Sequence, residues 1–143
     1  MDKVIVAYWS QTGNTAAMAA AVGEGITEAG KEAVVTDISS VSMDDLQAAS
    51  AFALGCPAMG AEVLEEAEME PFVAEVEEFA SGKKIALFGS YGWGDGEWMR
   101  DWEARMQSAG VELVGGAGLM CHETPDAEGL EECKELGRQL ANA

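Results

Sequence analysis

One short segment of the sequence, residues 10–15 (Ser-Gln-Thr-Gly-Asn-Thr), is rich in groups that bind phosphate. An apolar, strand-like run precedes it at residues 4–9, and an Ala-rich stretch with helical spacing follows it. Backbone N–H groups at a helix N-terminus, together with neutral hydroxyl and amide side chains, form a favourable phosphate site. No Lys or Arg occurs between Lys3 and Lys31, so the segment predicts phosphate binding without a formal counter-charge.

The sequence lacks residues that three other kinds of phosphate site require. A P-loop requires a Gly-Lys pair after the first strand, but Gly82-Lys83 precedes a later strand-like run. A dinucleotide fingerprint requires three glycines, and this loop contains only Gly13. A phospho-accepting receiver domain requires acidic residues at the ends of the first and third strands, where this sequence has Trp9-Ser10 and Gly55-Cys56.

Two further segments have the composition of a site for a planar ring. Residues 57–62 read Pro-Ala-Met-Gly-Ala-Glu, and residues 90–96 read Ser-Tyr-Gly-Trp-Gly-Asp-Gly. Trp93 stands between two glycines, where its own segment offers little to bury it, and such an aromatic usually meets a ligand or a partner. Met59 offers a polarizable apolar surface on the other segment. Together they would hold an aromatic ring whose phosphate lies in the first loop.

The elements that must position these loops alternate between strand and helix periodicity. We expect strands at residues 4–9, 33–37, 51–55 and 84–89, and a fifth from residue 111 that resumes at 117–121 after the Gly115-Gly116 break. We expect helices at residues 15–29, from Ser42, at about 66–80 and at 97–109, and a last one opened by Thr124 and Pro125. This order specifies an α/β protein with a mostly parallel sheet and helices on both faces. Ligands bind such sheets beyond the carboxyl ends of the strands, which is where the three loops lie.

Length and charge limit the remaining functions. The chain of 143 residues has 8 basic and 26 acidic residues, for a net charge of −18. We therefore expect a single domain, residues 1–143, with no binding to nucleic acid or to anionic membranes, and with partners that carry basic patches. No run of apolar residues is long enough to span a membrane, and no signal peptide precedes Val4.

The remaining reactive residue types point to no catalytic or metal site. The three cysteines, without a CxxC pair, predict buried thiols in a reducing cytoplasm. His122 is the only histidine, so we expect no metal centre. It is an ordinary polar position or, less favoured, a contact at a cofactor edge. Trp98 and Trp102 are four residues apart and should pack in the core. The sequence shows no set of nucleophile, base and orienting residue for hydrolysis.

The three loops closely resemble those of the flavodoxins, small FMN-containing electron carriers, and the similarity extends over essentially the whole chain. The short clostridial type is nearest, because the segment between Val111 and Cys121 is too short for the insertion of long-chain members. The resemblance implies a flavodoxin-like three-layer sandwich with a five-stranded parallel sheet in the order 2-1-3-4-5. Many relatives have a polar residue at the position of Ala61, and some have Ser in place of Pro57, so the strength of semiquinone stabilisation stays open.

The resemblance also implies roles for individual residues. Trp93 would stack on the outer face of the isoalloxazine, Met59 would cover the inner face, and Glu62 would bind the N3 edge. The peptide between Gly60 and Ala61 would turn its carbonyl toward N5, which a glycine permits at little conformational cost. Ser10, Thr12, Asn14 and Thr15 would hold the phosphate. The full set of expected FMN-binding residues is Ser10, Gln11, Thr12, Gly13, Asn14, Thr15, Pro57, Ala58, Met59, Gly60, Ala61, Glu62, Ser90, Tyr91, Gly92, Trp93 and Gly94.

The implied function is a low-potential one-electron carrier, not an enzyme, that cycles mainly between semiquinone and hydroquinone. Carboxylates near the ring would disfavour the anionic hydroquinone: Glu62, Glu65, Glu66, Asp95 and Glu97. We expect a cytoplasmic monomer that meets redox partner proteins with basic patches. The alternative is a flavodoxin-like NAD(P)H-dependent quinone or flavin reductase, which would need an open ring face that Trp93 would block. A binding module without cofactor is disfavoured because all three loops are intact.

Overall fold

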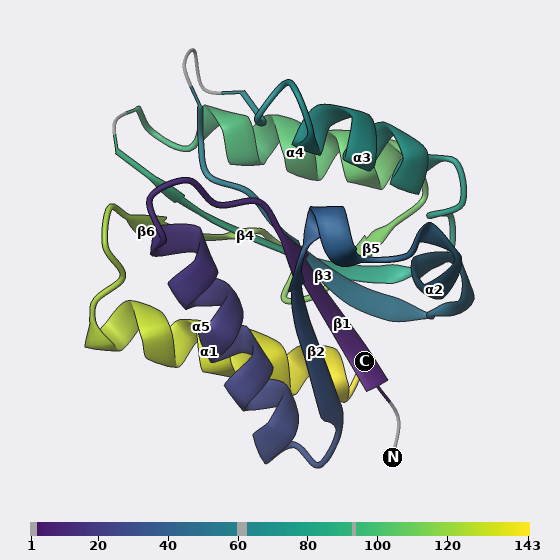
Figure 1. Ribbon diagram of the computed structural model, residues 1–143, viewed down its shortest axis with the longest axis horizontal. Coiled ribbons are helices and arrows are strands. Elements are labelled where there is room, and N and C mark those ends of the chain that lie inside the picture. Colours follow the sequence, from purple (N-terminus) through teal and green to yellow (C-terminus); the bar gives the residue numbers. More distant parts are fainter. Residues whose placement is uncertain (1–2, 60–62, 93) are drawn as a thin grey trace.

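A parallel sheet between two layers of helices forms the molecule (Figure 1). The computed structural model describes residues 3–59, 63–92 and 94–143. The strands are β1 (Lys3–Tyr8), β2 (Glu32–Asp37), β3 (Ala51–Gly55), β4 (Lys84–Tyr91), β5 (Glu112–Leu113) and β6 (Leu119–His122). Their order is β2-β1-β3-β4-β5, with β6 also paired to β4, and each of these pairings is parallel. The predicted fold class and strand order are confirmed.

The predicted fifth strand is divided into two short strands on the same edge of β4. Strand β5 pairs with Lys84–Ile85, and β6 pairs with residues 88–91. Between them Gly115 and Gly116 have φ angles of +82° and +83°, which take the chain out of the extended conformation. The break expected at the two glycines is therefore present. It allows β6 to continue the edge of the sheet as far as the carboxyl end of β4.

The helices cover both faces of the sheet. Helices α1 (Asn14–Glu28) and α5 (Ala127–Ala141) lie on one face, and α3 (Met69–Glu77) and α4 (Glu97–Ser108) lie on the other with the short α2 (Met43–Ala48) and a 3-10 turn, η1 (Ile38–Ser40) (Figure 1). Helices α1 and α5 can approach closely because Gly25 and Gly137 have no Cβ atom. A Cβ at Gly25 would clash with the carbonyl of Lys134, and one at Gly137 would clash with the carbonyl of Val22. None of the helices within the described residues is long and apolar enough to cross a membrane.

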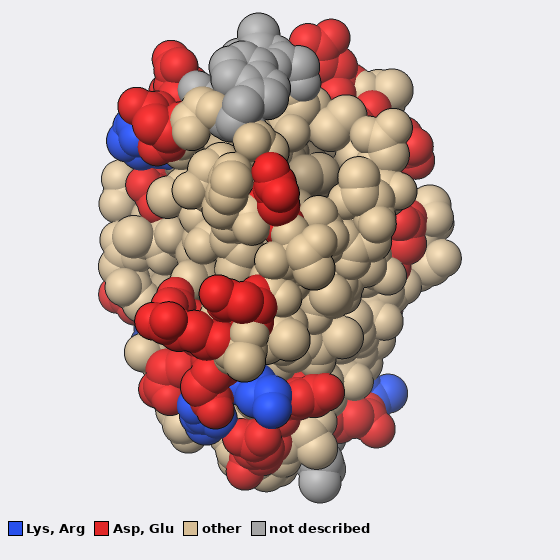
Figure 2. Space-filling model, turned by 90° about the vertical axis from the view of Figure 1, so that its left-hand side faces the viewer, with Lys and Arg blue, Asp and Glu red and all other residues tan. Residues whose placement is uncertain are grey.

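The acidic surplus lies on the surface, where most basic side chains are paired. Figure 2 shows the side of the molecule that carries β6 and the start of α5, with many acidic side chains and few basic ones. Six of the eight basic residues form ion pairs: Lys3, Lys84, Arg100, Arg105, Lys134 and Arg138. The pairing leaves most carboxylates without a basic partner, so the surface keeps a strong negative potential.

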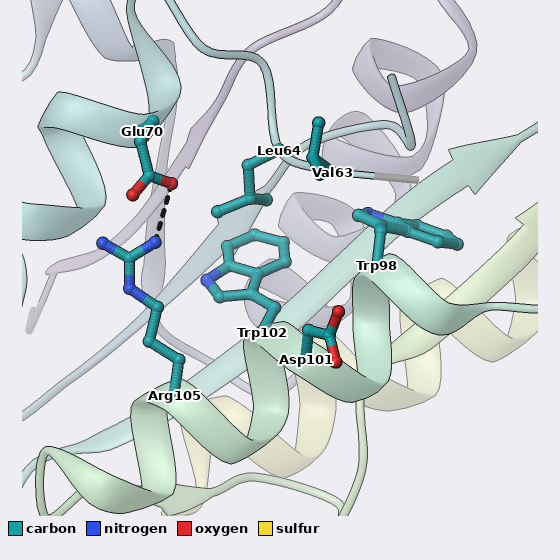
Figure 3. Close-up of a pocket in the computed structure, with 7 residues that line it drawn as sticks. All are labelled: Val63, Leu64, Glu70, Trp98, Asp101, Trp102 and Arg105. Atoms are coloured by element: carbon teal, nitrogen blue, oxygen red, sulfur yellow. Dashed lines mark hydrogen bonds and ion pairs between the residues drawn. The ribbon is translucent and has the colours of Figure 1, made fainter. Parts of the chain in front are cut away.

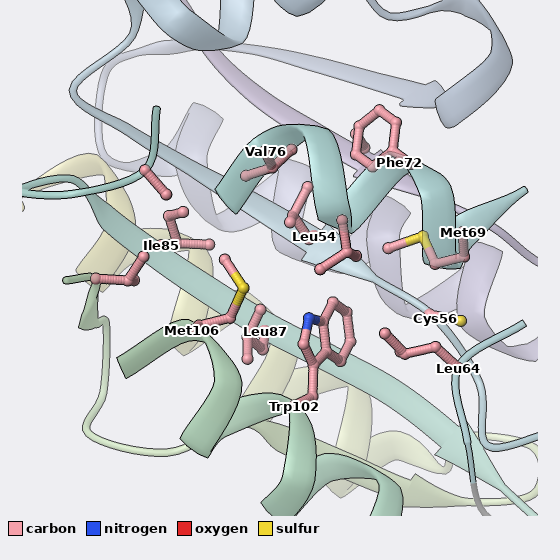
Figure 4. Close-up of a cluster of buried hydrophobic side chains, with 14 of the residues drawn as sticks. Leu54, Cys56, Leu64, Met69, Phe72, Val76, Ile85, Leu87, Trp102 and Met106 are labelled. Carbon is pink, nitrogen blue, oxygen red and sulfur yellow. The ribbon is translucent and has the colours of Figure 1, made fainter. Parts of the chain in front are cut away.

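Helices α3 and α4 are joined by a branched ion pair and by the larger of two cores. Arg105 of α4 contacts Glu70 at 2.7 Å, as Figure 3 shows, and it also contacts Glu77 at 2.6 Å. Beneath it, Trp102 and Met106 pack against side chains of β3, β4 and α3, which include Leu54 and Leu87 (Figure 4). The core positions predicted for Trp98 and Trp102 are confirmed, since each is 1% exposed.

Two predicted helix starts are wrong by a few residues because side-chain caps decide them. The last helix begins at Ala127, since the carboxylate of Asp126 accepts a hydrogen bond from the N–H of Gly129 at 2.7 Å. Helix α3 begins at Met69 and ends at Glu77, inside the predicted 66–80. The residues before it form turns around a buried carboxylate, that of Glu65.

Glu65 holds three backbone N–H groups that precede or open α3. Its carboxylate accepts from the N–H groups of residues 67, 68 and 69 at 2.8, 2.7 and 2.9 Å. Burial alone would raise the pKa of Glu65, but the three donated hydrogen bonds outweigh it and bring the pKa below its usual range. A carboxylate with a lowered pKa stabilises the fold above its unfolded pKa, and this contribution disappears as the pH falls through the folded pKa.

The substitution Glu65→Gln should therefore lower the free energy of unfolding at pH 7 by about 1–2 kcal/mol, because an amide oxygen is a weaker cap than a carboxylate. Urea unfolding followed by far-UV circular dichroism at pH 7 and in the acid range checks this. The difference from the parent should shrink as the pH is lowered. The matched control is Glu66→Gln at the exposed neighbouring position. An equal loss in both variants, or a loss independent of pH, would contradict the assignment.

Candidate functional site

A cleft of about 270 Å³ lies where the carboxyl ends of β1, β3 and β4 meet. It brings together residues from all three predicted loops and from one segment that we had not predicted. The described residues that line it are Gln11, Thr12, Asn14, Pro57, Ala58, Met59, Ser90, Tyr91, Gly92 and Glu123. No Lys or Arg is among these lining residues. Ser10, Gly13, Thr15 and Gly94 lie in the same loops without lining the cleft, and Gly60, Ala61, Glu62 and Trp93 are outside the described residues.

The first loop gathers backbone donors at the start of α1. Gly13, at φ +93°, is the residue that precedes the helix, and as a glycine it has no side chain that could cap the helix. The Ser10 hydroxyl accepts from the N–H groups of Gly13 and Ala16 at 3.2 and 3.3 Å, and the Thr12 hydroxyl accepts from that of Asn14 at 3.4 Å. These bonds are long, so an anionic oxygen would be a stronger acceptor for the same N–H groups. The loop thus presents neutral donors at the start of α1, and its role as a phosphate site stays a prediction.

A buried pair of hydroxyl groups ties the first loop to the third. Thr15 Oγ1 and Ser90 Oγ are 2.8 Å apart, and Thr15 Oγ1 also accepts from the backbone N–H of Ser90 at 3.4 Å. The two residues are 1% and 4% exposed. Because Ser90 and Tyr91 continue β4 beyond the strand end we predicted, this pair connects the start of α1 to the carboxyl end of β4.

The second loop is hydrogen-bonded to the end of β4, and an isolated antiparallel β-bridge joins its two sides. The N–H of Ala58 donates to the carbonyl of Ser90 at 3.0 Å. Met59 and Val63 exchange two backbone hydrogen bonds, at 2.9 and 3.1 Å, around residues 60–62. The indole N–H of Trp98 donates to the carbonyl of Cys56 at 3.2 Å, so α4 also holds this loop. Met59 is thereby placed in the lining of the cleft, as predicted for the residue that covers a ring.

The segment that follows β6 also borders the cleft, and our sequence analysis missed it. Glu123 lines the cleft with a φ of +57°, and its N–H donates to the carbonyl of Tyr91 at 2.7 Å. The Thr124 hydroxyl donates to the side-chain oxygen of Asn14 at 3.3 Å. His122 contacts the carbonyl of Gly92 at 3.2 Å and the ring of Tyr91. The available signal was the fifth strand, whose carboxyl end reaches the same edge of the sheet.

The carboxylates expected around a bound ring have different surroundings. Glu65 is used as the cap of α3, and Asp95 forms an ion pair with Arg100 at 2.9 Å. Glu123 instead lines the cleft, and its Oε1 atom lies 3.8 Å from Nε2 of His122. Burial raises the pKa of the nearby Cys56 thiol to about 12, which favours the protonated thiol at this loop.

One cleft at the carboxyl edge of a doubly wound α/β sheet thus combines neutral donors with the apolar residues Pro57, Ala58 and Met59, which is typical of the class of protein that binds a phosphorylated planar cofactor. A family model described as flavodoxin matches residues 6–137. The chain is 48% identical to a flavodoxin of Clostridium beijerinckii over 137 residues, which cover 96% of this chain and 98% of that protein. It is 42% identical to a flavodoxin of Megasphaera elsdenii over 140 residues, 98% of this chain and 99% of that one.

The solution structure of two-electron reduced Megasphaera elsdenii flavodoxin superimposes with a TM-score of 0.87 at 41% identity, over 98% of this chain and 99% of that chain. The chain belongs to the flavodoxin family. Flavodoxins are electron carriers that bind FMN and are not enzymes, so the alternative of a nicotinamide-dependent reductase is not supported. The donor set of the first loop and the apolar wall at Pro57, Ala58 and Met59 fit FMN.

The link between Thr15 and Ser90 can be tested through FMN affinity. Thr15→Val should raise the dissociation constant of FMN about tenfold, because the first loop loses its anchor and Ser90 keeps a buried hydroxyl without its partner. Ser90→Ala should have a similar effect, and the double variant should add little to either. Quenching of FMN fluorescence during titration of the apoprotein measures the constant.

Two matched variants separate this role from general damage. Thr15→Ser keeps the hydroxyl and should bind FMN nearly as the parent does. Thr27→Val makes the same change on the exposed face of α1, where the hydroxyl only contacts the carbonyl of Gly23. Fully additive effects of Thr15→Val and Ser90→Ala would show that the two hydroxyl groups act independently.

Proposed function

We propose that this flavodoxin is a low-potential one-electron carrier whose FMN lies in the cleft at the carboxyl ends of β1, β3, β4 and β6. When bound, FMN supplies a ring that accepts and releases single electrons. The observation that carries the proposal is the charge of the cleft: its described lining includes the carboxylate of Glu123 and no basic side chain. An environment of this kind disfavours the extra negative charge of the fully reduced ring.

We assign the phosphate end of FMN to the first loop. The hydroxyl groups of Ser10 and Thr12 and the amide of Asn14 surround the backbone donors of Gly13 and Ala16. The buried hydroxyl group of Thr15 anchors this loop by its hydrogen bond with the hydroxyl group of Ser90. Gln11 lines the cleft beside them.

The ring end belongs to the second and third loops. Pro57, Ala58 and Met59 of the second loop line the cleft, as do Tyr91 and Gly92 at the end of β4. The roles of Gly60, Ala61, Glu62 and Trp93 rest on the resemblance of their segments to those of other flavodoxins, as does that of Gly94. Trp93 would stack on the outer face of the ring, and Glu62 would bind its N3 edge.

A single carboxylate makes a measurable contribution to the potential. At ~12 Å and an effective dielectric constant of about 40, one negative charge raises the energy of a second negative charge by ~0.7 kcal/mol, or roughly 30 mV for a one-electron step. Salt screens exposed carboxylates such as Glu123, which reduces this value. Several acids around the ring would lower the potential of the second step together.

Glu123→Gln should therefore raise the potential of the second one-electron step by roughly 10–30 mV, with the larger value at low ionic strength. Anaerobic titration with dithionite in the presence of reference dyes, followed by visible absorption, measures both steps. Glu112→Gln removes one charge from β5, which pairs with the opposite end of β4, and should leave the potential unchanged. Equal shifts in the two variants would show that overall charge, and not the position of Glu123, sets the potential.

We infer further that the partners are redox proteins with basic patches, and that the carrier works as a monomeric, single domain in the cytoplasm. The net charge of −18 and the pairing of most basic side chains support these inferences, because like charges oppose self-association and attract a basic surface. Sedimentation equilibrium at low and high salt tests the monomer, which should persist at both.

Electron transfer from the reduced protein to a basic acceptor protein should be fast at low salt and fall steeply as salt is added, because salt screens the attraction. Stopped-flow mixing at several ionic strengths measures the rate. An acidic acceptor of similar potential is the control, and its rate should rise with salt. A flat dependence for the basic acceptor would contradict electrostatic steering.

A further inference from the structure

Two free thiols meet where β6 packs on α5. Cys121 lies in β6 and Cys133 lies in the middle of α5, and both belong to the core between the sheet, α1 and α5. The Cys121 sulfur lies against Gly129, and Cys133 is four residues further along α5, so it lies one helical turn away on the same face of the helix. The proposed function gives these two thiols no role, because neither residue lines the FMN cleft.

The two thiols differ in their access to solvent. Cys121 lines a pocket of about 370 Å³ that is formed by the end of β6 and the first turn of α5. Its sulfur lies against Gly129, where an added Cβ would be only 3.0 Å away, so the glycine leaves room for the thiol. Cys133 does not line the pocket and is fully buried. A small reagent in the pocket would therefore meet Cys121 and would not reach Cys133.

The surroundings favour Cys121 as the attacking thiol. The interaction with Cys133 lowers the pKa of Cys121, although burial and the carboxylates of Glu132 and Asp126 oppose this. The first turn of α5, against which the sulfur lies, presents the positive end of the helix dipole. The interaction with Cys121 and burial raise the pKa of Cys133.

We propose that Cys121 and Cys133 form a peroxide-reactive dithiol, with Cys121 as the attacking and Cys133 as the resolving residue. The Cys121 sulfur attacks one oxygen of hydrogen peroxide and the O–O bond breaks, which gives a sulfenic acid and, after proton transfer, one water. The Cys133 sulfur then attacks the Cys121 sulfur, the S–S bond forms, and the sulfenic oxygen leaves as a second water. Two thiols are oxidised by two electrons, and one peroxide is reduced to two waters.

The charge of the pocket selects the class of oxidant. Asp126, Glu128 and Glu132 line it, and the surrounding surface is strongly acidic (Figure 2). Anionic oxidants such as glutathione disulfide are repelled from such a surface, whereas hydrogen peroxide is small and uncharged. The disulfide between Cys121 and Cys133 would link α5 covalently to β6, the strand that is followed by Glu123 and Thr124 at the border of the FMN cleft.

The test exposes the FMN-loaded protein to hydrogen peroxide, alkylates free thiols under denaturing conditions and maps the product by mass spectrometry. We expect a disulfide between Cys121 and Cys133, with Cys56 still alkylated, because burial keeps the Cys56 thiol protonated. Cys133→Ser should stop the reaction at a sulfenic acid on Cys121, which dimedone traps. Cys121→Ser should leave Cys133 reduced, and Cys56→Ser should react as the parent does.

Three results would overturn the proposal: oxidation of Cys56 as fast as that of Cys121, an unmodified Cys121 in Cys133→Ser, or an equal rate with glutathione disulfide and with peroxide at the same concentration. Cys121 of the parent should be oxidised about ten times faster than either of the cysteines that remain in the Cys121→Ser variant. The readout is the mass of the cysteine peptides, which does not depend on electron transfer. Failure of the dithiol proposal would therefore leave the proposed electron-carrier function unaffected. Conversely, a protein that fails as a carrier could still form this disulfide.

Discussion

The carboxyl end of β4 is the point on which the rest of the site depends. Strand β4 pairs in parallel with β3 on one edge and with β5 and β6 on the other, so the ends of these strands reach one edge of the sheet. Ser90 bonds to Thr15 of the first loop, and its carbonyl accepts the N–H of Ala58 in the second. Tyr91 accepts the N–H of Glu123 after β6. Three segments that are far apart in the sequence are thus hydrogen-bonded to two residues at the end of one strand.

The negative charge of this protein has two physical roles that depend on local pairing. Where a carboxylate is buried and receives several N–H donors, as Glu65 does, it stabilises the start of a helix. Where it is exposed and lines the cleft, as Glu123 does, we propose that it disfavours further negative charge on a bound ring. Asp95 is compensated by Arg100, so sequence distance from the cleft does not by itself decide which acids matter.

The three cysteines show the same dependence on surroundings. Cys56 is buried at the end of β3, where burial dominates and the thiol is inert. Cys121 is also buried, yet it borders a pocket and interacts with a second thiol. All three were expected to be buried, and they are. The difference in reactivity that we infer between them comes from the neighbours that β6 and α5 bring together.

The sequence by itself determined the alternation of strands and helices, the strand order through its resemblance, and the three loops, because periodicity and loop composition act within a few residues of the chain. Only the tertiary structure decided the helix starts at Met69 and Ala127, the Thr15–Ser90 pair, the place of Glu123 and the meeting of Cys121 with Cys133. These features need contacts between residues far apart in sequence, such as the 75 positions that separate Thr15 from Ser90. Local propensity carries no information on which distant side chains will share a buried position, since packing of the whole chain selects them.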